Sequence, residues 1–111
     1  MRILVVGASG YIGSHLVPRL GQQGHQVRAA ARNRASLQAR RWEGVECVSA
    51  DVLRPDTLDT VLEGIDVAYY LVHSMGSGRD FPRLDREGAR NFRRAAERAG
   101  VRRIIYLGGL Q

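Results

Sequence analysis

The sequence predicts an α/β fold, a doubly wound parallel sheet with helices on both faces. Short apolar runs and amphipathic helical patterns alternate five times along the 111 residues, and a glycine-rich turn joins the first run to the first helix. Strands that alternate with helices are joined by right-handed crossovers, which makes them parallel. We therefore expect one Rossmann-type domain over residues 1–111, with strand order 3-2-1-4-5.

The five strands are expected where apolar runs are too short to form helices. Residues 2–6, for example, form a buried strand that Gly7 ends. The fourth run is rich in Val, Tyr and Leu, as strands often are. The full set is expected at residues 2–6, 26–31, 45–49, 66–72 and 103–107.

Helices are expected at residues 11–23, 35–42, 55–63 and 80–99. In the first, Ile12, Leu16 and Leu20 recur at a spacing of four, and Pro18 is expected to kink the helix. Pro55 opens the third helix and Asp80 is a candidate cap for the fourth. Gly24, Gly64 and Gly100 follow three of these helices as stop signals.

The chain ends soon after the fifth strand, where a complete dinucleotide-binding fold would continue with a further helix and strand. We therefore expect the N-terminal part of a longer protein, truncated after that strand. Ile104 and Ile105 make the strand apolar on both faces, as for a strand buried between helices. The resulting uncovered sheet predicts self-association of the isolated chain.

The strongest motif is the G-x-x-G-x-x-G turn between the first strand and the first helix. Gly7 allows the tight turn, Gly10 lets a pyrophosphate approach the backbone, and Gly13 lets the helix pack closely on the sheet. The helix N-terminus then offers free N–H groups to phosphate. A glycine-rich turn without a ligand is the alternative. The candidate cofactor residues here are Gly7, Ser9, Gly10, Tyr11, Ile12 and Gly13.

Arg32, Asn33 and Arg34 follow the second strand, where an NAD-specific site would place Asp or Glu for the ribose 2′-hydroxyl. A guanidinium there suits the 2′-phosphate of NADP through paired hydrogen bonds. The pattern therefore predicts NADP rather than NAD. The alternative is that Arg32 is a solvated surface charge.

Two further strand ends supply candidate cofactor contacts. Asp51 and Val52 follow the third strand, where a carboxylate can accept a hydrogen bond from the adenine amine, although Asp is also common in turns. The fourth strand ends on the segment that contains Leu71, Val72 and His73, beside the expected cofactor ribose. His73 is as compatible with a place in the loop as with a cofactor contact. For Ser74, a role as a polar loop residue is favoured over a role as a catalytic hydroxyl.

Composition excludes several kinds of chemistry. All 17 basic residues are Arg, which excludes Schiff-base lysines and Walker-type phosphate loops. Cys47 is the single cysteine, and His15, His25 and His73 lack metal-ligand spacing, so no metal site is expected. The opening apolar run is too short for a signal peptide, and no stretch approaches a transmembrane span. These features predict a soluble cytoplasmic protein.

The net charge of +6 is concentrated near the fourth helix, where Arg86, Arg90, Arg94 and Arg98 recur at a spacing of four. Such a stripe can bind nucleic-acid phosphates. Glu87 and Glu97 interleave with it, however, and no aromatic side chains accompany the arginines. A solvated helix face is therefore favoured over a nucleic-acid interface.

The segments VVGASGYIGSHLVPRL, AARN, ADV, YYLVHSMG and RRIIYLGGL together resemble the short-chain dehydrogenase/reductase superfamily. Within it they are most similar to the atypical NAD(P)H-binding branch of NmrA-like and YbjT-like proteins. The resemblance spans nearly the whole chain. It implies cofactor contacts at Gly7, Ser9, Gly10, Tyr11, Ile12, Arg32, Asp51, Val52, Leu71 and His73.

The resemblance implies an oxidoreductase or epimerase-like protein acting on an unknown small molecule, or alternatively a non-catalytic NADP sensor. Active members use a Tyr-x-x-x-Lys pair and a Ser after the fifth strand. This chain contains no Lys, and Gly108 and Gly109 stand where that Ser is expected. We therefore assign no catalytic residue within these 111 residues.

Overall fold

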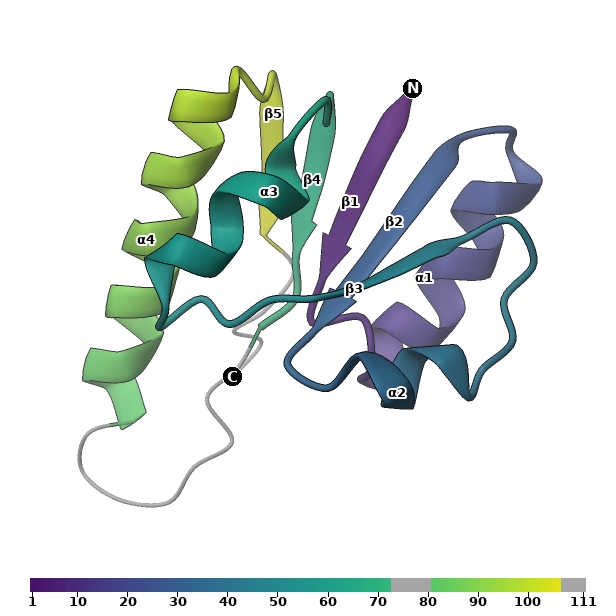
Figure 1. Cartoon of the computed structure of the whole chain (residues 1–111), viewed down its shortest axis with the longest axis horizontal. Helices are drawn as coiled ribbons and strands as arrows, with labels where there is room; N and C mark the ends of the chain where they lie inside the picture. Colours follow the sequence, from purple (N-terminus) through teal and green to yellow (C-terminus); the bar gives the residue numbers. More distant parts are fainter. Residues whose placement is uncertain (73–80, 107–111) are drawn as a thin grey trace.

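The computed structural model describes residues 1–72 and 81–106, and within them the predicted topology is confirmed (Figure 1). All strand pairings are parallel, and the sheet order is β3-β2-β1-β4-β5. The strands are Arg2–Val6 (β1), Gln26–Ala31 (β2), Glu46–Ser49 (β3), Val67–Tyr70 (β4) and Arg103–Tyr106 (β5).

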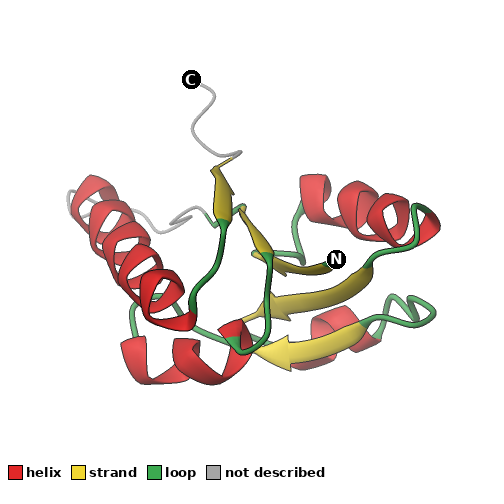
Figure 2. Ribbon diagram, turned by 90° about the horizontal axis from the view of Figure 1, so that it is seen from above, coloured by secondary structure: helices red, strands yellow, loops and turns green. Residues whose placement is uncertain are grey.

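Helices cover both faces of this sheet (Figure 2). One face packs against α1 and α2, and the other packs against α3 and α4. A 3-10 turn, η1, leads into α3. The bounds are Tyr11–Gln22 (α1), Arg34–Gln38 (α2), Pro55–Thr57 (η1), Leu58–Leu62 (α3) and Phe81–Ala99 (α4).

The core consists of two apolar clusters, because successive strand residues point to opposite faces of the sheet. Leu4 and Val6 of β1 pack into the cluster under α3 and α4, whereas Ile3 and Val5 pack into the cluster under α1 and α2. The central strands are thus buried on both sides, as parallel sheets require.

Several element boundaries differ from the prediction. The second helix ends at Gln38 instead of residue 42, because Arg41 and Gly44 adopt positive φ angles of 54° and 72° that turn the chain toward β3. The third strand begins at Glu46, and the fourth runs only over Val67–Tyr70. The predicted third helix opens as η1. As predicted, Pro18 does not end α1. Asp80 and Leu107 lie outside the described residues.

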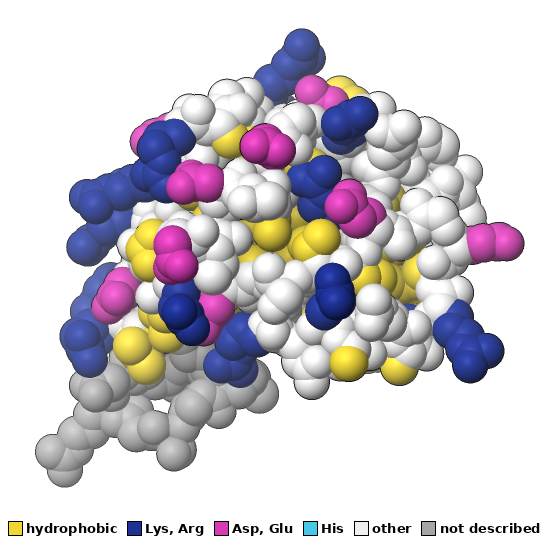
Figure 3. All heavy atoms as spheres, viewed as in Figure 1, with side chains coloured by type: hydrophobic (Ala, Val, Ile, Leu, Met, Phe, Trp, Pro, Cys, Tyr) yellow, Lys and Arg dark blue, Asp and Glu magenta, His cyan; other side chains and the backbone are white. Residues whose placement is uncertain are grey.

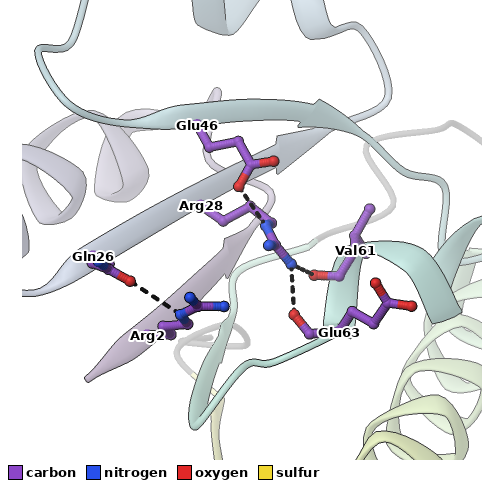
Figure 4. A network of polar contacts seen from close by, with 6 residues as sticks. All are labelled: Arg2, Gln26, Arg28, Glu46, Val61 and Glu63. Carbon is purple, nitrogen blue, oxygen red and sulfur yellow. Dashed lines mark hydrogen bonds and ion pairs between the residues drawn. The ribbon is translucent and has the colours of Figure 1, made fainter.

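A polar network ties β2 and β3 to α3 (Figure 4). The Arg28 guanidinium donates to the Val61 and Glu63 carbonyls at 2.7 and 3.0 Å, and to Glu46 Oε1 at 2.9 Å. On the neighbouring strand, Arg2 Nε donates to Gln26 Oε1 at 3.0 Å. The network fixes the end of α3 that lies away from the candidate site described below.

Candidate functional site

The candidate site is a cleft of about 530 Å³ at the carboxyl ends of the strands. Parallel strands all end at the same edge of the sheet, so the loops after β1, β2, β3 and β4 converge there. The strand order reverses between β1 and β4, where open α/β sheets bind ligands. Its lining includes the candidate residues Gly7, Ser9, Gly10, Arg32, Asp51, Val52, Leu71 and Val72.

The glycine-rich turn forms one wall, and two of its glycines are required by close packing. Gly7 has a φ of 82°, and a Cβ there would lie 2.9 Å from the Leu71 carbonyl carbon. A Cβ on Gly13 would lie only 2.4 Å from the Ala8 carbonyl oxygen. The turn is anchored to β2 because the N–H groups of Gly7 and Ala8 both donate to the Ala30 carbonyl, at 2.9 and 3.1 Å.

Gly10 is different, because it is free of close contacts and faces the cleft. A Cβ there would meet nothing nearer than the Gly7 carbonyl oxygen at 3.9 Å. Gly10 is also the N-cap of α1, with no side-chain cap and no acidic residue in the first turn. The positive end of the helix dipole and the first N–H groups therefore remain available to an anion. This cradle fits a pyrophosphate group.

Arg32 lies at the end of β2 and lines the cleft. Its carbonyl accepts a hydrogen bond from Ser49 Oγ at 2.9 Å, which fixes the backbone beside β3. The side chain is exposed, and its guanidinium has no hydrogen-bond or ion-pair partner within residues 1–72 and 81–106. A cation without a counter-ion at this position is suited to an anionic ligand.

Asn33 and Arg34 do not line the cleft. Asn33 Oδ1 accepts from the Ala35 N–H at 3.0 Å and so caps α2. Arg34 begins that helix. Burial raises the pKa of Cys47, and the Arg34 charge partly opposes this by lowering it. Tyr11, Ile12 and Gly13 continue from the turn into α1 without lining the cleft, and His73 and Ser74 lie outside the described residues.

Asp51 serves a turn and also borders the cleft. Its Oδ1 accepts from the Leu53 N–H at 3.0 Å, and its backbone exchanges hydrogen bonds with Thr57 Oγ1. The next residue, Val52, is buried, and its carbonyl accepts from Asn91 Nδ2 of α4 at 2.8 Å. The third strand end is therefore held against α4.

Sequence reasoning missed the wall that β4 and α4 contribute, formed by Tyr70, Leu84 and Asp85. Burial chiefly raises the pKa of Tyr70, and the Asp85 charge and Tyr106 raise it further, so its hydroxyl stays protonated at neutral pH. The signal for this wall was Gly88, where a Cβ would lie 2.7 Å from Val52 Cγ2. A glycine in the middle of a helix marks such a close approach.

The arginines of α4 are spread over the outer surface of the helix, and acidic side chains lie between them (Figure 3). Arg98 pairs with Asp59 at 2.9 Å. In the described part of the chain, no group of three or more His, Cys, Asp or Glu side chains could hold a metal ion. No helix found there combines the length and apolar character needed to cross a bilayer.

Comparison with known proteins identifies the family. Residues 7–111 match the family model described as NAD(P)H-binding. The photosystem II assembly factor Ycf39 of Synechocystis is 32% identical over 110 residues, covering 96% of this chain and 33% of that protein. A 3-beta-hydroxysteroid dehydrogenase of Mycolicibacterium neoaurum is 31% identical over 116 residues, covering 95% of this chain and 31% of that protein.

Solved structures of NAD(P)-binding proteins share this fold. The NADPH-dependent quinone oxidoreductase QOR2 of Escherichia coli, complexed with NADPH, has a TM-score of 0.77 at 28% identity, covering 94% of this chain and 35% of that one. A short-chain dehydrogenase/reductase superfamily protein from Agrobacterium tumefaciens, with bound NAD, has a TM-score of 0.79 at 27% identity, covering 96% and 32%.

The chain thus spans about one third of the length of these relatives. Its sheet order, its glycine cradle at the switch point and the family match over residues 7–111 agree with one another. The chain belongs to the NAD(P)H-binding family, as a Rossmann protein of the atypical short-chain dehydrogenase/reductase type.

Proposed function

We propose that this chain binds NADP(H) in preference to NAD(H), as the cofactor-binding portion of an oxidoreductase or epimerase-like protein. The observation that carries the proposal is Arg32, an exposed guanidinium without a partner in the described part of the chain, at the edge of the cleft. An NAD-specific site would carry a carboxylate at the end of the second strand, to accept from the ribose 2′-hydroxyl. Arginine cannot accept a hydrogen bond but binds a phosphate with two N–H groups.

The proposed binding mode uses the whole cleft. The pyrophosphate would lie at the Gly10 end of α1, the 2′-phosphate beside Arg32, and the adenine near Asp51 and Val52. Leu71 and Val72, between β1 and the α4 wall, would lie along the ribose. When bound, the nicotinamide would accept or donate a hydride, while these residues only bind and orient it.

Calorimetry on the chain tests the preference. NADPH should bind at least ~10-fold more tightly than NADH, because a charge-assisted paired contact contributes on the order of 1.5–3 kcal/mol. Arg32→Ala should remove most of the difference by weakening NADPH alone. Equal affinities for the two dinucleotides in the unsubstituted chain would contradict the preference.

Gly10→Ala provides a separate test of the phosphate cradle. The new methyl group has room against the protein, so stability should be almost unchanged, but it would occupy the space proposed for the pyrophosphate. Both NADPH and NADH should then lose affinity by roughly tenfold or more, since both carry this group. A variant that binds both dinucleotides normally would place the pyrophosphate elsewhere.

The absence of lysine supports a second candidate, a dinucleotide-binding protein that performs no hydride transfer within this chain. No Tyr-x-x-x-Lys pair can form from these residues, and the buried Tyr70 holds its proton too firmly to act as a base near neutral pH. A similar protein, Ycf39, is described as an assembly factor. We expect the chain to bind NADPH without oxidising it when carbonyl compounds are added. Steady loss of NADPH absorbance would favour the enzyme instead.

A cytoplasmic location belongs to the same proposal, as does a small-molecule substrate of unknown identity. Cell fractionation followed by detection of the protein tests the location. Recovery in a membrane or exported fraction would contradict it.

A further inference from the structure

A second arginine lies beside the glycine-rich turn, outside every motif of the sequence. Arg40 follows α2, and its Nη2 donates to the carbonyl oxygen of Ser9 at 3.0 Å. Ser9 lines the cleft together with Gly10 and Arg32. A residue 31 positions along the chain from Ser9 is therefore held at the rim of the cofactor cleft.

The position of Arg40 is well defined by its surroundings. The Asn33 cap and the fully buried Leu37 hold α2 on the sheet, and the Arg40 N–H donates to the Leu37 carbonyl at 3.1 Å. The guanidinium carbon lies 5.8 Å from the ring centroid of Trp42, within the range of a cation–π contact. The side chain is thus directed back to the turn.

The charge of Arg40 is not neutralised. Its acceptor is a main-chain carbonyl, and none of the carboxylates in the described ranges forms an ion pair with it. A guanidinium has five N–H donors, and the bond to Ser9 uses one of them. The side chain is exposed, so the remaining donors can reach a ligand.

We propose that Arg40 is a specificity-determining residue that binds the ribose 2′-phosphate together with Arg32. This inference rests on the proposed NADP(H) function and extends it to a residue on a different element. The turn is anchored to β2 through Ala30, two residues before Arg32. Arg32 lines the cleft, and Arg40 is bonded to Ser9, which lines it too. A dianionic phosphomonoester that lies between the turn and the end of β2 would be stabilised by both cations.

The experiment compares NADPH and NADH binding, because both carry the pyrophosphate and only NADPH carries the 2′-phosphate. Arg40→Gln should weaken NADPH by roughly tenfold and NADH by less than about twofold. Arg40→Lys, which keeps the charge, should retain most of the preference. Arg19→Gln, at the opposite end of α1 from Gly10, removes the same charge and should leave both affinities nearly unchanged.

The outcomes separate this inference from the proposed function. If Arg40→Gln weakens NADPH and NADH equally, Arg40 only positions the glycine-rich turn. If it changes neither affinity, Arg40 has no role in binding. Either result overturns the inference, while Arg32→Ala can still support the preference for NADP. If the unsubstituted chain binds neither dinucleotide, or binds both equally and Arg32→Ala changes nothing, the proposed function fails and this inference fails with it.

Discussion

Arg28 on β2 donates a hydrogen bond of 2.7 Å to the main-chain carbonyl of Val61, near the end of α3. The last carbonyls of a helix have no partner within the helix, so a guanidinium that reaches them acts as a C-terminal cap. The Arg28 side chain is only 17% exposed, and Glu46 balances its charge. One side chain thus joins β2, β3 and α3 (Figure 4).

Arg28→Met should therefore destabilise the fold by about 1.5–3 kcal/mol, because the carbonyls of Val61 and Glu63 lose a charged donor. Methionine keeps the apolar stem, so the loss reports mainly on the hydrogen bonds. The matched control is Arg98→Met, which removes the exposed pair with Asp59, worth about 0–1 kcal/mol. Urea unfolding measures both, and equal effects would contradict the cap assignment.

Two glycines of α1 should respond in opposite directions to the same substitution. Gly13→Ala places a Cβ against the backbone of Ala8 and should cost about 1–3 kcal/mol. Gly21→Ala meets nothing within 4 Å and should stabilise the helix by about 0.4–1 kcal/mol. Chemical denaturation of the two variants checks the prediction; a harmless Gly13→Ala would mean that α1 can move away from the turn.

The thiol of Cys47 should be unreactive near neutral pH. Burial raises its pKa above the ordinary value of 9.0, so at pH 8 the native chain should react with iodoacetamide more slowly than the unfolded chain does. Arg34→Gln should slow the reaction further, because the Arg34 charge lowers that pKa. A faster reaction in the native chain would contradict this.

The raised pKa of Cys47 makes the stability of the fold depend on pH. Because the folded pKa lies above the unfolded one, the contribution of the Cys47 thiol is complete below about pH 9. It is lost as the pH rises from the unfolded pKa through the folded pKa. Cys47→Ala should flatten this part of the pH–stability profile.

We expect the isolated chain to self-associate. Ile105 of β5 is the partner of Tyr69 of β4, and Tyr69 packs against the cluster under α1 and α2. Figure 2 shows α4 on one side of β5, whereas α1, on the other face of the sheet, lies away from β5 and contacts β2. Ile105 is only half-buried there. The chain should therefore elute as an oligomer and bind a hydrophobic dye.

Ile105→Asp should reduce both the oligomer and the dye signal, whereas Tyr11→Ser should not, although Tyr11 is 80% exposed. Light scattering after size-exclusion chromatography gives the mass. A monodisperse monomer of the unsubstituted chain that unfolds cooperatively and binds no dye would contradict the prediction.

Local pattern was sufficient to predict the strands, their order and the glycine-rich turn. An apolar run ended by Gly7, followed by helical periodicity, leaves few arrangements other than a strand and a crossover helix. The carboxyl ends of parallel strands meet at one edge of the sheet, so the sequence alone places Arg32, Asp51 and Leu71 at that edge.

Only the tertiary structure shows which side chains face those residues across the cleft. Arg40 reaches Ser9 because the Asn33 cap and the buried Leu37 hold α2 on the sheet just before it, and no periodicity encodes that contact. Tyr70 and Asp85 enter the cleft wall because Gly88 lets α4 approach Val52. The sequence determines which face of a helix or strand is apolar, because that face is set by residues a few positions apart. Contacts between elements far apart in the chain are decided by the distance at which those elements pack, which only the tertiary structure fixes.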